Sequence, residues 1–266
     1  MFNFVTALAA EARPLIQRYR LVKTEADWPL YQGDGLQLIV AGVGRLATAA
    51  ATAYLAGRTP QRPLAWLNIG IAGHGVLAVG TPLLAHKITD AQTVHFPAFP
   101  FRPPCATDVV HTVDQPETGY ADKIAYDMEA AAFWPTACRF ASAELVHCLK
   151  IVSDNPTQPA DRLDAAAVAE LVAAKLELVD QLHTLITPLA QVLAPGRQDP
   201  PFYAAARQRW RFSTAQQHQL RRLLFQWGAQ SPEENPWDRA PAPLQSGSDA
   251  LHFLRQRLAA CPPPRF

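Results

Sequence analysis

The stretch LVHCLKIVSD at residues 145–154 decides the fold. Residues 145–152 form a short, largely apolar run, which is typical of a strand buried within a sheet. Polar residues follow at once, as Ser153-Asp154-Asn155. Because open α/β sheets bind ligands at the carboxyl ends of their strands, this stretch predicts both a buried strand and a polar site at its end.

Further apolar runs upstream predict the other strands of the same sheet. The longer runs lie at residues 2–8, 36–41, 64–71 and 81–91, and shorter strands are expected at 109–113 and 123–126. Between them, residues 96–107 are rich in Pro and Phe and are not expected to form a regular element.

Helical segments alternate with these strands. The first helix is expected to begin near Ala12 or Arg13, since Pro14 fits only in a first turn. Further helices are expected at residues 46–55, 128–140 and 163–186. Gly57 should end the first of these, and Pro135 should kink the second. The alternation predicts an α/β layer fold with a largely parallel or mixed sheet.

Three carboxylates fall at junctions between predicted elements. Glu11 follows the first strand, Glu129 begins a helix, and Asp154 ends the strand quoted above. Taken singly, each is explained by an ordinary structural role, because acidic residues stabilise the first turn of a helix and an Asp after a strand often forms an Asx turn.

Taken together, these junctions lie in segments that resemble the purine nucleoside phosphorylase/uridine phosphorylase superfamily. Within it, they are most similar to the methylthioadenosine/S-adenosylhomocysteine nucleosidases. The resemblance implies the α/β fold of that superfamily, a three-layer α/β/α sandwich around a mixed twisted sheet. The matching segments occur in family order over about residues 1–188: ALAAE at 7–11, GVGR at 42–45, NIGIAGH at 68–74, VGT at 79–81, DMEAAA at 127–132 and LKIVSD at 149–154. The MEAAA and IVSD pieces are the specific ones, whereas the Gly-rich pieces alone are weak signals.

The resemblance implies a role for each carboxylate in hydrolysis of the N-ribosidic bond of a purine nucleoside of the adenosyl type. Glu11 would activate the attacking water, Glu129 would hold the ribose hydroxyls, and Asp154 would protonate the leaving base. It also implies substrate contacts from a further set of residues: Met128, Gly70, Ala72, Gly73, His74 and Ser153. No cofactor and no metal ion are implied.

Physical chemistry makes these roles reasonable. Cleavage of an N-ribosidic bond passes through an oxocarbenium-like state, whose positive charge carboxylates stabilise. A carboxylate can also accept hydrogen bonds from two hydroxyls at once. The acid, Asp154, must keep its proton near neutral pH and is therefore expected to be buried, while Glu11 must be ionised.

Two alternatives stay open. A phosphate-dependent phosphorylase needs a cationic anion site, but the turn after the first strand carries Glu11, which would repel phosphate; Arg45 is the one candidate anion contact. A silenced, nucleoside-binding or structural relative is the other alternative. Ile71 stands where the family usually has Ser or Thr, and the stretch 95–127 is short. The rings of Phe96, Phe99 and Phe101 are candidates to replace the base-stacking wall of that stretch.

The C-terminal residues have a different composition. The whole chain is nearly neutral, at +1, but residues 195–266 hold ten Arg, no Lys and five Asp or Glu. Amphipathic helices are expected at 213–230, capped by Ser213 or Thr214, and after Ser248, with a Pro-rich loop between them. We therefore predict a catalytic domain at 1–192 and an Arg/Pro-rich helical extension at 193–266, which packs on the body or on a partner subunit.

Other features bound the class of protein. The four cysteines and the histidines have no spacing typical of a zinc site or a disulfide framework. No apolar run reaches 18 residues, and the first residues lack a basic signal-peptide segment, so we expect a cytoplasmic protein without a membrane anchor. A small nucleoside is the expected partner, a homo-oligomer with a dimer favoured is the expected assembly, and nucleic acid is not an expected ligand because no binding motif accompanies the modest basic charge.

Overall fold

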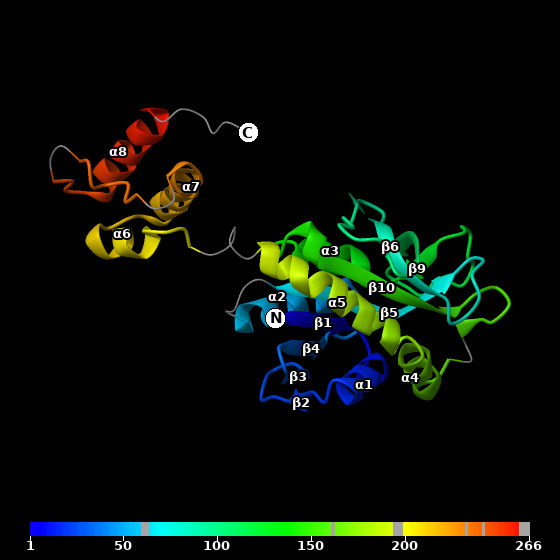
Figure 1. Ribbon diagram of the computed structural model, residues 1–266. Helices are drawn as coiled ribbons and strands as arrows, with labels where there is room; N and C mark the ends of the chain where they lie inside the picture. Colours follow the sequence, from blue (N-terminus) through cyan, green and yellow to red (C-terminus); the bar gives the residue numbers. More distant parts are fainter. Residues whose placement is uncertain (60–63, 161–162, 194–198, 232–233, 241–242, 261–266) are drawn as a thin grey trace. The chain divides into compact units, whose positions relative to one another are not determined.

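The computed structural model describes residues 1–59, 64–160, 163–193, 199–231, 234–240 and 243–260. The chain divides into two compact units, Met1–Ala194 and Pro195–Phe266, and each is described by itself (Figure 1). Within the described residues, no helix is both long enough and apolar enough to span a bilayer.

Ten strands of the described residues join in one mixed sheet in the first unit. They are β1 (Phe2–Thr6), β2 (Val22–Lys23), β3 (Leu30–Gly33), β4 (Leu36–Val40), β5 (Ala65–His74), β6 (Pro82–Thr89), β7 (Val94–His95), β8 (Ala106–Thr112), β9 (Ala125–Asp127) and β10 (Val146–Asp154). Parallel β1 lies between β4 and β5, and β3 and β2 continue that edge antiparallel. Beyond β5, the sheet forms a closed ring of strands. β5 pairs with β9, β9 with β8, β8 with β6, β6 with β10, and β10 again with β5.

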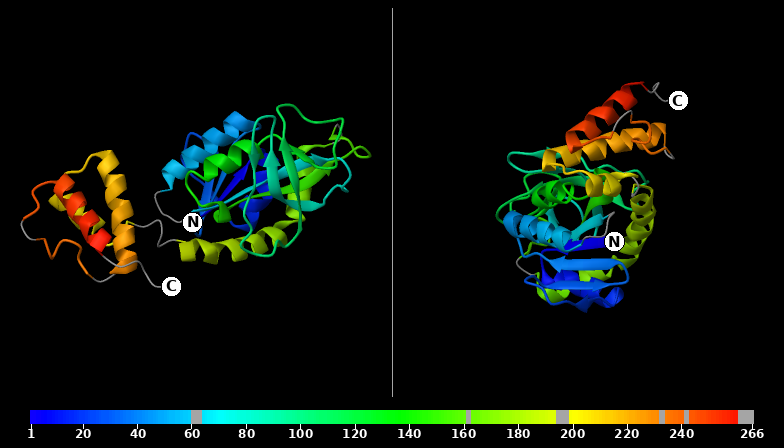
Figure 2. Two further views of the ribbon diagram at one scale, coloured as in Figure 1. Left: turned by 90° about the horizontal axis from the view of Figure 1, so that it is seen from above. Right: turned by 90° about the vertical axis from the view of Figure 1, so that its left-hand side faces the viewer.

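Helices cover both faces of this sheet, and the predicted fold class is confirmed. The helices are α1 (Ala9–Arg18), α2 (Arg45–Arg58), α3 (Ala130–Ala137), α4 (Ala165–Ala173) and α5 (Leu176–Leu193), with a short 3-10 turn η1 (Ala143–Leu145). Helices α2 and α3 pack against each other, while α1 packs against α4 and α5. The left view of Figure 2 shows α2 and α3 on one side of the strands and α5 on the other.

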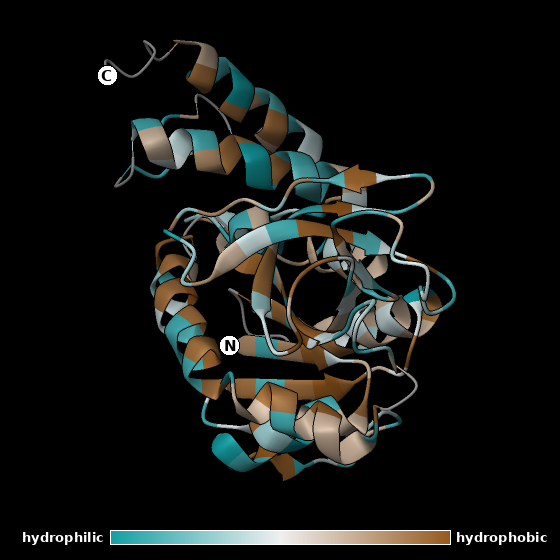
Figure 3. Cartoon of the chain, turned by 90° about the vertical axis from the view of Figure 1, so that its right-hand side faces the viewer, coloured by the Kyte–Doolittle hydropathy of each residue, from teal (hydrophilic) through white to brown (hydrophobic). Residues whose placement is uncertain are grey.

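The central strands hold the core. Every residue of β1 and β10 is buried, including the Lys150 side chain. Figure 3 shows hydrophobic residues concentrated in the strands, whereas the helices alternate hydrophobic and hydrophilic bands. Helices with one apolar stripe bury that stripe against the sheet, which makes the layers stable.

The first helix begins earlier than expected. Helix α1 starts at Ala9, so Pro14 lies inside it rather than in its first turn. The Glu11 side chain explains the early start, because it accepts the backbone N–H groups of Ala7 and Leu8, which the helix itself leaves unsatisfied. This is half of a capping box, since Leu8 has no side-chain acceptor to complete it.

Other boundaries also differ from the sequence-based predictions. Helix α2 runs past Gly57 to Arg58, and α3 is confined to Ala130–Ala137 because the Asp127 carboxylate accepts the Ala130 N–H and sets the start of the helix. The single helix expected at 163–186 is two helices. The N–H of Lys175 bonds back to the Val172 carbonyl, and this tight turn ends α4 before α5 begins.

The second unit is a small helical body with its own aromatic core. Helices α6 (Tyr203–Arg209), α7 (Thr214–Gln230) and α8 (Gly247–Ala260) surround the rings of Trp210, Trp227 and Trp237. Ser213 caps α7, as one of the two residues expected there, whereas α6 was not expected. The Arg257 guanidinium lies over the Trp227 ring, with 4.3 Å from its carbon to the ring centroid. Arginine here therefore contributes to packing within the unit as well as to charge.

Candidate functional site

One cavity of about 220 Å³ lies at the carboxyl ends of the central strands. It is lined by residues of the first unit: Ala7, Leu8, Glu11, Val43, Ile71, Ala72, Gly73, Val113, Pro116, Glu117, Tyr126, Asp127, Met128, Glu129, Ser153, Asp154, Ala160 and Leu163. All three junction carboxylates are in this lining. The fold thus brings Glu11 to the same cavity as Glu129 and Asp154, which lie more than 100 residues further along the sequence.

Glu11 is held rigidly at the start of α1. One carboxylate oxygen accepts the N–H groups of Ala7 and Leu8, both at 2.9 Å, and the other accepts the N–H of Ile71 at 3.0 Å. Burial raises the pKa of Glu11 above its ordinary value, while these amides and the Lys150 charge limit the rise. Ile71, which cannot hydrogen-bond through its side chain, thus orients Glu11 through its backbone.

Two glycines of β5 give the carboxylates room. A Cβ atom at Gly70 would lie 2.7 Å from Glu11 Oε1, and one at Gly73 would lie 2.6 Å from Asp154 Oδ2. Real Cβ atoms do not approach oxygen so closely, so each glycine is required by the carboxylate that packs over it. Gly73 and Ala72 line the cavity, whereas Gly70 supports Glu11 from behind.

Glu129 belongs to a buried cluster of charged side chains. Among the described residues that influence its pKa, Lys150 is the one cation, and Asp127 and Glu11 are carboxylates. One of its oxygens accepts the N–H of Gly44 at 2.9 Å, and the other lies 3.9 Å from Lys150 Nζ. Lys150 is 1% exposed and pairs with Asp127 at 2.7 Å. Burial raises the pKa of Glu129 to about 7, against the opposing charge of Lys150. Burial alone would lower the pKa of Lys150, but Asp127 and Glu129 more than offset this and raise it.

Asp154 lies at the end of β10 and is 7% exposed. The Tyr120 hydroxyl donates to its Oδ2 at 2.6 Å, and the Ser153 hydroxyl donates to its Oδ1. The turn that follows is fixed by Asn155, whose side-chain oxygen accepts the N–H groups of Thr157 and Gln158. This Asx turn fixes the backbone on the C-terminal side of Asp154.

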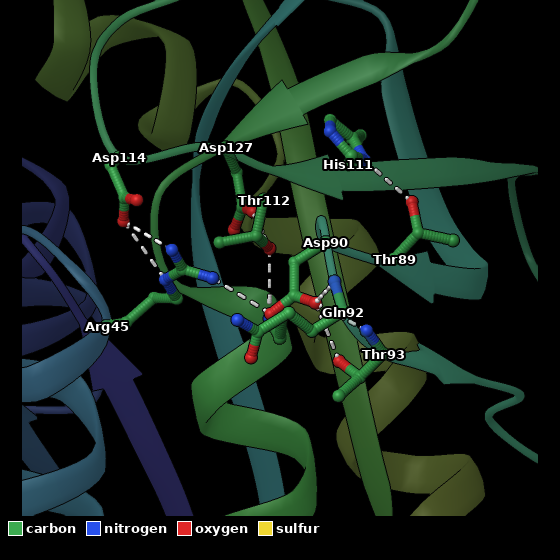
Figure 4. A network of polar contacts seen from close by, with 10 residues as sticks. Arg45, Thr89, Asp90, Gln92, Thr93, His111, Thr112, Asp114 and Asp127 are labelled. Carbon is green, nitrogen blue, oxygen red and sulfur yellow. Dashed lines mark hydrogen bonds and ion pairs between the residues drawn. The ribbon is translucent and has the colours of Figure 1, made fainter.

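Two predicted contacts are held away from the cavity. Arg45 is paired with Asp90 at 2.9 Å and with Asp114 at 2.5 Å, as Figure 4 shows, and it does not line the cavity. His74 is buried outside the lining; its Nδ1 accepts two backbone N–H groups, and its Nε2 lies 3.1 Å from Asp108.

The proposed aromatic wall is also elsewhere. The Phe99 and Phe101 rings pack on the buried His147 ring, and Phe96 is 66% exposed. Tyr126 and Met128 line the cavity instead. Of the residues that the sequence pattern singled out for substrate contact or catalysis, four more line the cavity: Met128, Glu129, Ser153 and Asp154.

Sequence reasoning missed two members of the site. Lys150 gave a signal, because a lysine inside an otherwise apolar strand must find a carboxylate partner. Tyr120 gave none, since it lies in an irregular segment and reaches Asp154 only in the folded chain. Within the described residues, no group of three or more His, Cys, Asp and Glu side chains is arranged to hold a metal ion.

This topology and its strand-end cavity define a protein with the fold of nucleoside phosphorylases and hydrolases. Comparisons with protein-family models and with curated proteins return no match to the sequence. Solved structures do match. The 5′-methylthioadenosine nucleosidase of Arabidopsis thaliana, in apo form, is similar with a TM-score of 0.57 and 18% identity, over 70% of this chain and 95% of that one.

Two further solved structures extend this likeness. The 5′-methylthioadenosine/S-adenosylhomocysteine nucleosidase of S. pneumoniae, with the transition-state inhibitor MT-ImmA, has a TM-score of 0.54 and 18% identity over 67% of this chain and 96% of that one. A futalosine hydrolase mutant of Helicobacter pylori has a TM-score of 0.53 and 14% identity over 68% of this chain and 98% of that one. At these identities the likeness shows a shared fold.

Proposed function

We propose that the chain hydrolyses the N-ribosidic bond of a purine nucleoside of the adenosyl type. The observation that supports this most is the convergence of Glu11, Glu129 and Asp154 on one cavity at the strand ends. The likeness to nucleosidases supports the same reaction class. Fold alone does not determine function, so the proposal depends on the three side chains.

The proposed reaction uses each carboxylate once. Glu11 accepts a proton from water as the water oxygen bonds to C1′ of the ribose. The electrons of the C1′–N bond pass to the base, and Asp154 gives its proton to a ring nitrogen of that base. The products are a free sugar and a neutral base, and the proton on Glu11 returns to Asp154 through solvent. Glu129 holds the ribose hydroxyls and stabilises the positive charge that develops on the ring.

The charges of the lining favour water over phosphate as the acceptor. No Lys or Arg is among the described residues that line the cavity, whereas four carboxylates besides Asp154 are. A phosphate dianion would be repelled by these groups. The Lys150 ammonium is already paired with Asp127 and Glu129.

The apolar lining favours a substrate without a charged 5′ group. Leu8, Val43, Ile71 and Val113 contribute hydrocarbon surface to the cavity. An apolar substituent such as a methylthio group would gain from leaving water there. We therefore propose methylthioadenosine or 5′-deoxyadenosine as the first compounds to test.

We also propose that the chain works as a homo-oligomer, with a dimer favoured. Val43, which lines the cavity, is 50% exposed, and the neighbouring Leu46 is 90% exposed. Burial of such side chains against a second copy would be favourable. Light scattering on the purified chain gives the mass, and a monomer at all concentrations would contradict this proposal.

The experiment measures release of free base from a small panel, with and without phosphate. The panel contains methylthioadenosine, S-adenosylhomocysteine, 5′-deoxyadenosine, adenosine and inosine. Glu11→Gln and Asp154→Asn should each lower kcat by about 10²- to 10⁴-fold, the range for loss of general acid or base catalysis. Asp180→Asn is the matched control, since Asp180 also accepts a tyrosine hydroxyl but lies outside the cavity.

Each outcome of this experiment has a distinct meaning. Phosphate-independent release that falls in both variants supports the nucleosidase. Release only with phosphate would make the chain a phosphorylase. Binding seen by thermal shift without release from any compound would favour a silenced nucleoside-binding protein.

A further inference from the structure

We infer that Tyr120 is a positioning residue for the acid Asp154 and that its hydroxyl stabilises the carboxylate formed when the base is protonated. This inference rests on the proposed function. Its basis is the hydrogen bond of 2.6 Å from the Tyr120 hydroxyl to Asp154 Oδ2, in a buried setting beside the cavity.

Several contacts bring Tyr120 to this position. It lies in the irregular segment between β8 and β9, whose residues Pro116 and Glu117 line the cavity. One oxygen of Glu117 accepts the N–H groups of Gly119 at 2.5 Å and Tyr120 at 3.2 Å. A Cβ atom at Gly73 would lie 3.1 Å from the Tyr120 ring as well as 2.6 Å from Asp154, so the same glycine accommodates both partners.

The backbone of Tyr120 is strained. Its φ is +47°, in the left-handed region that favours glycine, although the adjacent Gly119 has no positive φ. A bulky residue persists there only when its surroundings impose the conformation, and such strain gathers at functional sites. If the segment needed only a turn, the glycine would take this position at lower cost. The chain instead strains the residue whose hydroxyl reaches Asp154.

The same hydrogen bond helps the proton to leave. While Asp154 is neutral, Tyr120 donates to an uncharged oxygen. As the proton passes from Asp154 to the ring nitrogen of the base, Asp154 gains a negative charge and the Tyr120 bond becomes charge-assisted. Tyr120 keeps its own proton throughout, so atoms and charges balance without another reactant. An interaction that strengthens only as the reaction proceeds lowers the barrier instead of tightening substrate binding.

The test compares Tyr120→Phe with wild type on methylthioadenosine. We expect kcat to fall about 10- to 100-fold, as for loss of one hydrogen bond to a charged group, while KM changes by less than about threefold. In the Asp154→Asn background, Tyr120→Phe should lower the residual rate by less than about twofold, because the two residues act as a unit. Tyr19→Phe is the matched control; its hydroxyl donates to Asp180 at 2.7 Å, away from the cavity.

A second probe separates positioning from a purely structural role. 4-Nitrophenyl β-D-ribofuranoside has a leaving group that departs without protonation, so its cleavage should be the same for Tyr120→Phe and wild type. The inference would be overturned if Tyr120→Phe lowered kcat equally on both substrates. It would also be overturned if Tyr120→Phe lowered kcat by the same factor in the wild-type and Asp154→Asn backgrounds. An active wild type with unchanged kcat in Tyr120→Phe would overturn it while leaving the proposed function intact. A wild type that releases no base would remove both.

Discussion

Gly70→Ala is the substitution whose effect can be worked out most directly from the structure. The new Cβ would lie 2.7 Å from Glu11 Oε1, so that oxygen must move by several tenths of an ångström. Glu11 has little freedom to do so, because it is 2% exposed and three backbone N–H groups hold it. The movement lengthens the bond from the Ile71 N–H, which is 3.0 Å in the wild type.

The magnitude follows from the loss of that bond. A hydrogen bond to a charged group contributes about 1.5–3 kcal/mol, and Gly→Ala at a compatible site returns about 0.4–1 kcal/mol through the unfolded state. The net loss of unfolding free energy should be about 1–2 kcal/mol. Displacement of the base should also lower kcat by about 10- to 100-fold, since misplacements on the order of 1 Å cost about 10²-fold.

The assays are urea unfolding and steady-state release of the base. Gly57→Ala in helix α2 is the matched control, because no atom lies within 4 Å of its new Cβ. It should stabilise the protein by about 0.5–1 kcal/mol and leave kcat unchanged. A Gly70→Ala protein that behaved like this control would refute the tight packing of Gly70 against Glu11.

Four further predictions concern the charge cluster and the second unit. Since the pKa of Glu129 is about 7, kcat/KM should fall as pH drops below that value; a profile that stays level through the acidic range would contradict this role. Glu129 binds its proton more tightly in the folded than in the unfolded chain. Its contribution to the free energy of unfolding is therefore present below pH 4.5 and is lost as pH rises to about 7. Glu129→Gln should reduce this loss of stability with pH, measured by denaturant titrations over that range. Lys150→Met should cost about 3–5 kcal/mol of unfolding free energy and move the acid limb of kcat/KM to higher pH, because it leaves Asp127 and Glu129 without their cation. A limb that did not move would show that Lys150 does not hold Glu129 ionised. We propose that residues 193–266 pack on the catalytic domain or on a partner subunit, which should slow proteolysis near Pro195, a position outside the described residues. Rapid cleavage there that leaves a stable, unchanged oligomer would count against this proposal.

The strands were predictable because burial leaves a direct mark on sequence. An apolar run bounded by polar residues was enough for β4 and β10, and the periodicity of α7 was enough for that helix. The start of α1 could not be predicted from such a pattern, because it depends on the Glu11 side chain, which accepts backbone N–H groups at the start of its own helix. The division between α4 and α5 was not predictable either, because no Gly or Pro marks the turn at Lys175 that ends α4.

The site divides in the same way. The three carboxylates were recognisable because each sits within a short local motif. The contact of Tyr120 with Asp154 was not, because it depends on an irregular segment that crosses Gly73 and on a backbone conformation that tyrosine rarely adopts. His74 was expected to contact substrate because of its place in a Gly-rich turn, and that stays a prediction; in the folded chain both of its ring nitrogens have protein partners.

In the proposed reaction, water activated by Glu11 displaces the base. The most direct measurement is mass spectrometry of the sugar released from methylthioadenosine in ¹⁸O-labelled water, for wild type and Glu11→Gln. Hydrolysis by this route should give a free sugar with one labelled oxygen at C1′, formed without phosphate and much more slowly in the variant. A sugar 1-phosphate that carries no label from water, or equal rates for the two proteins, would contradict it.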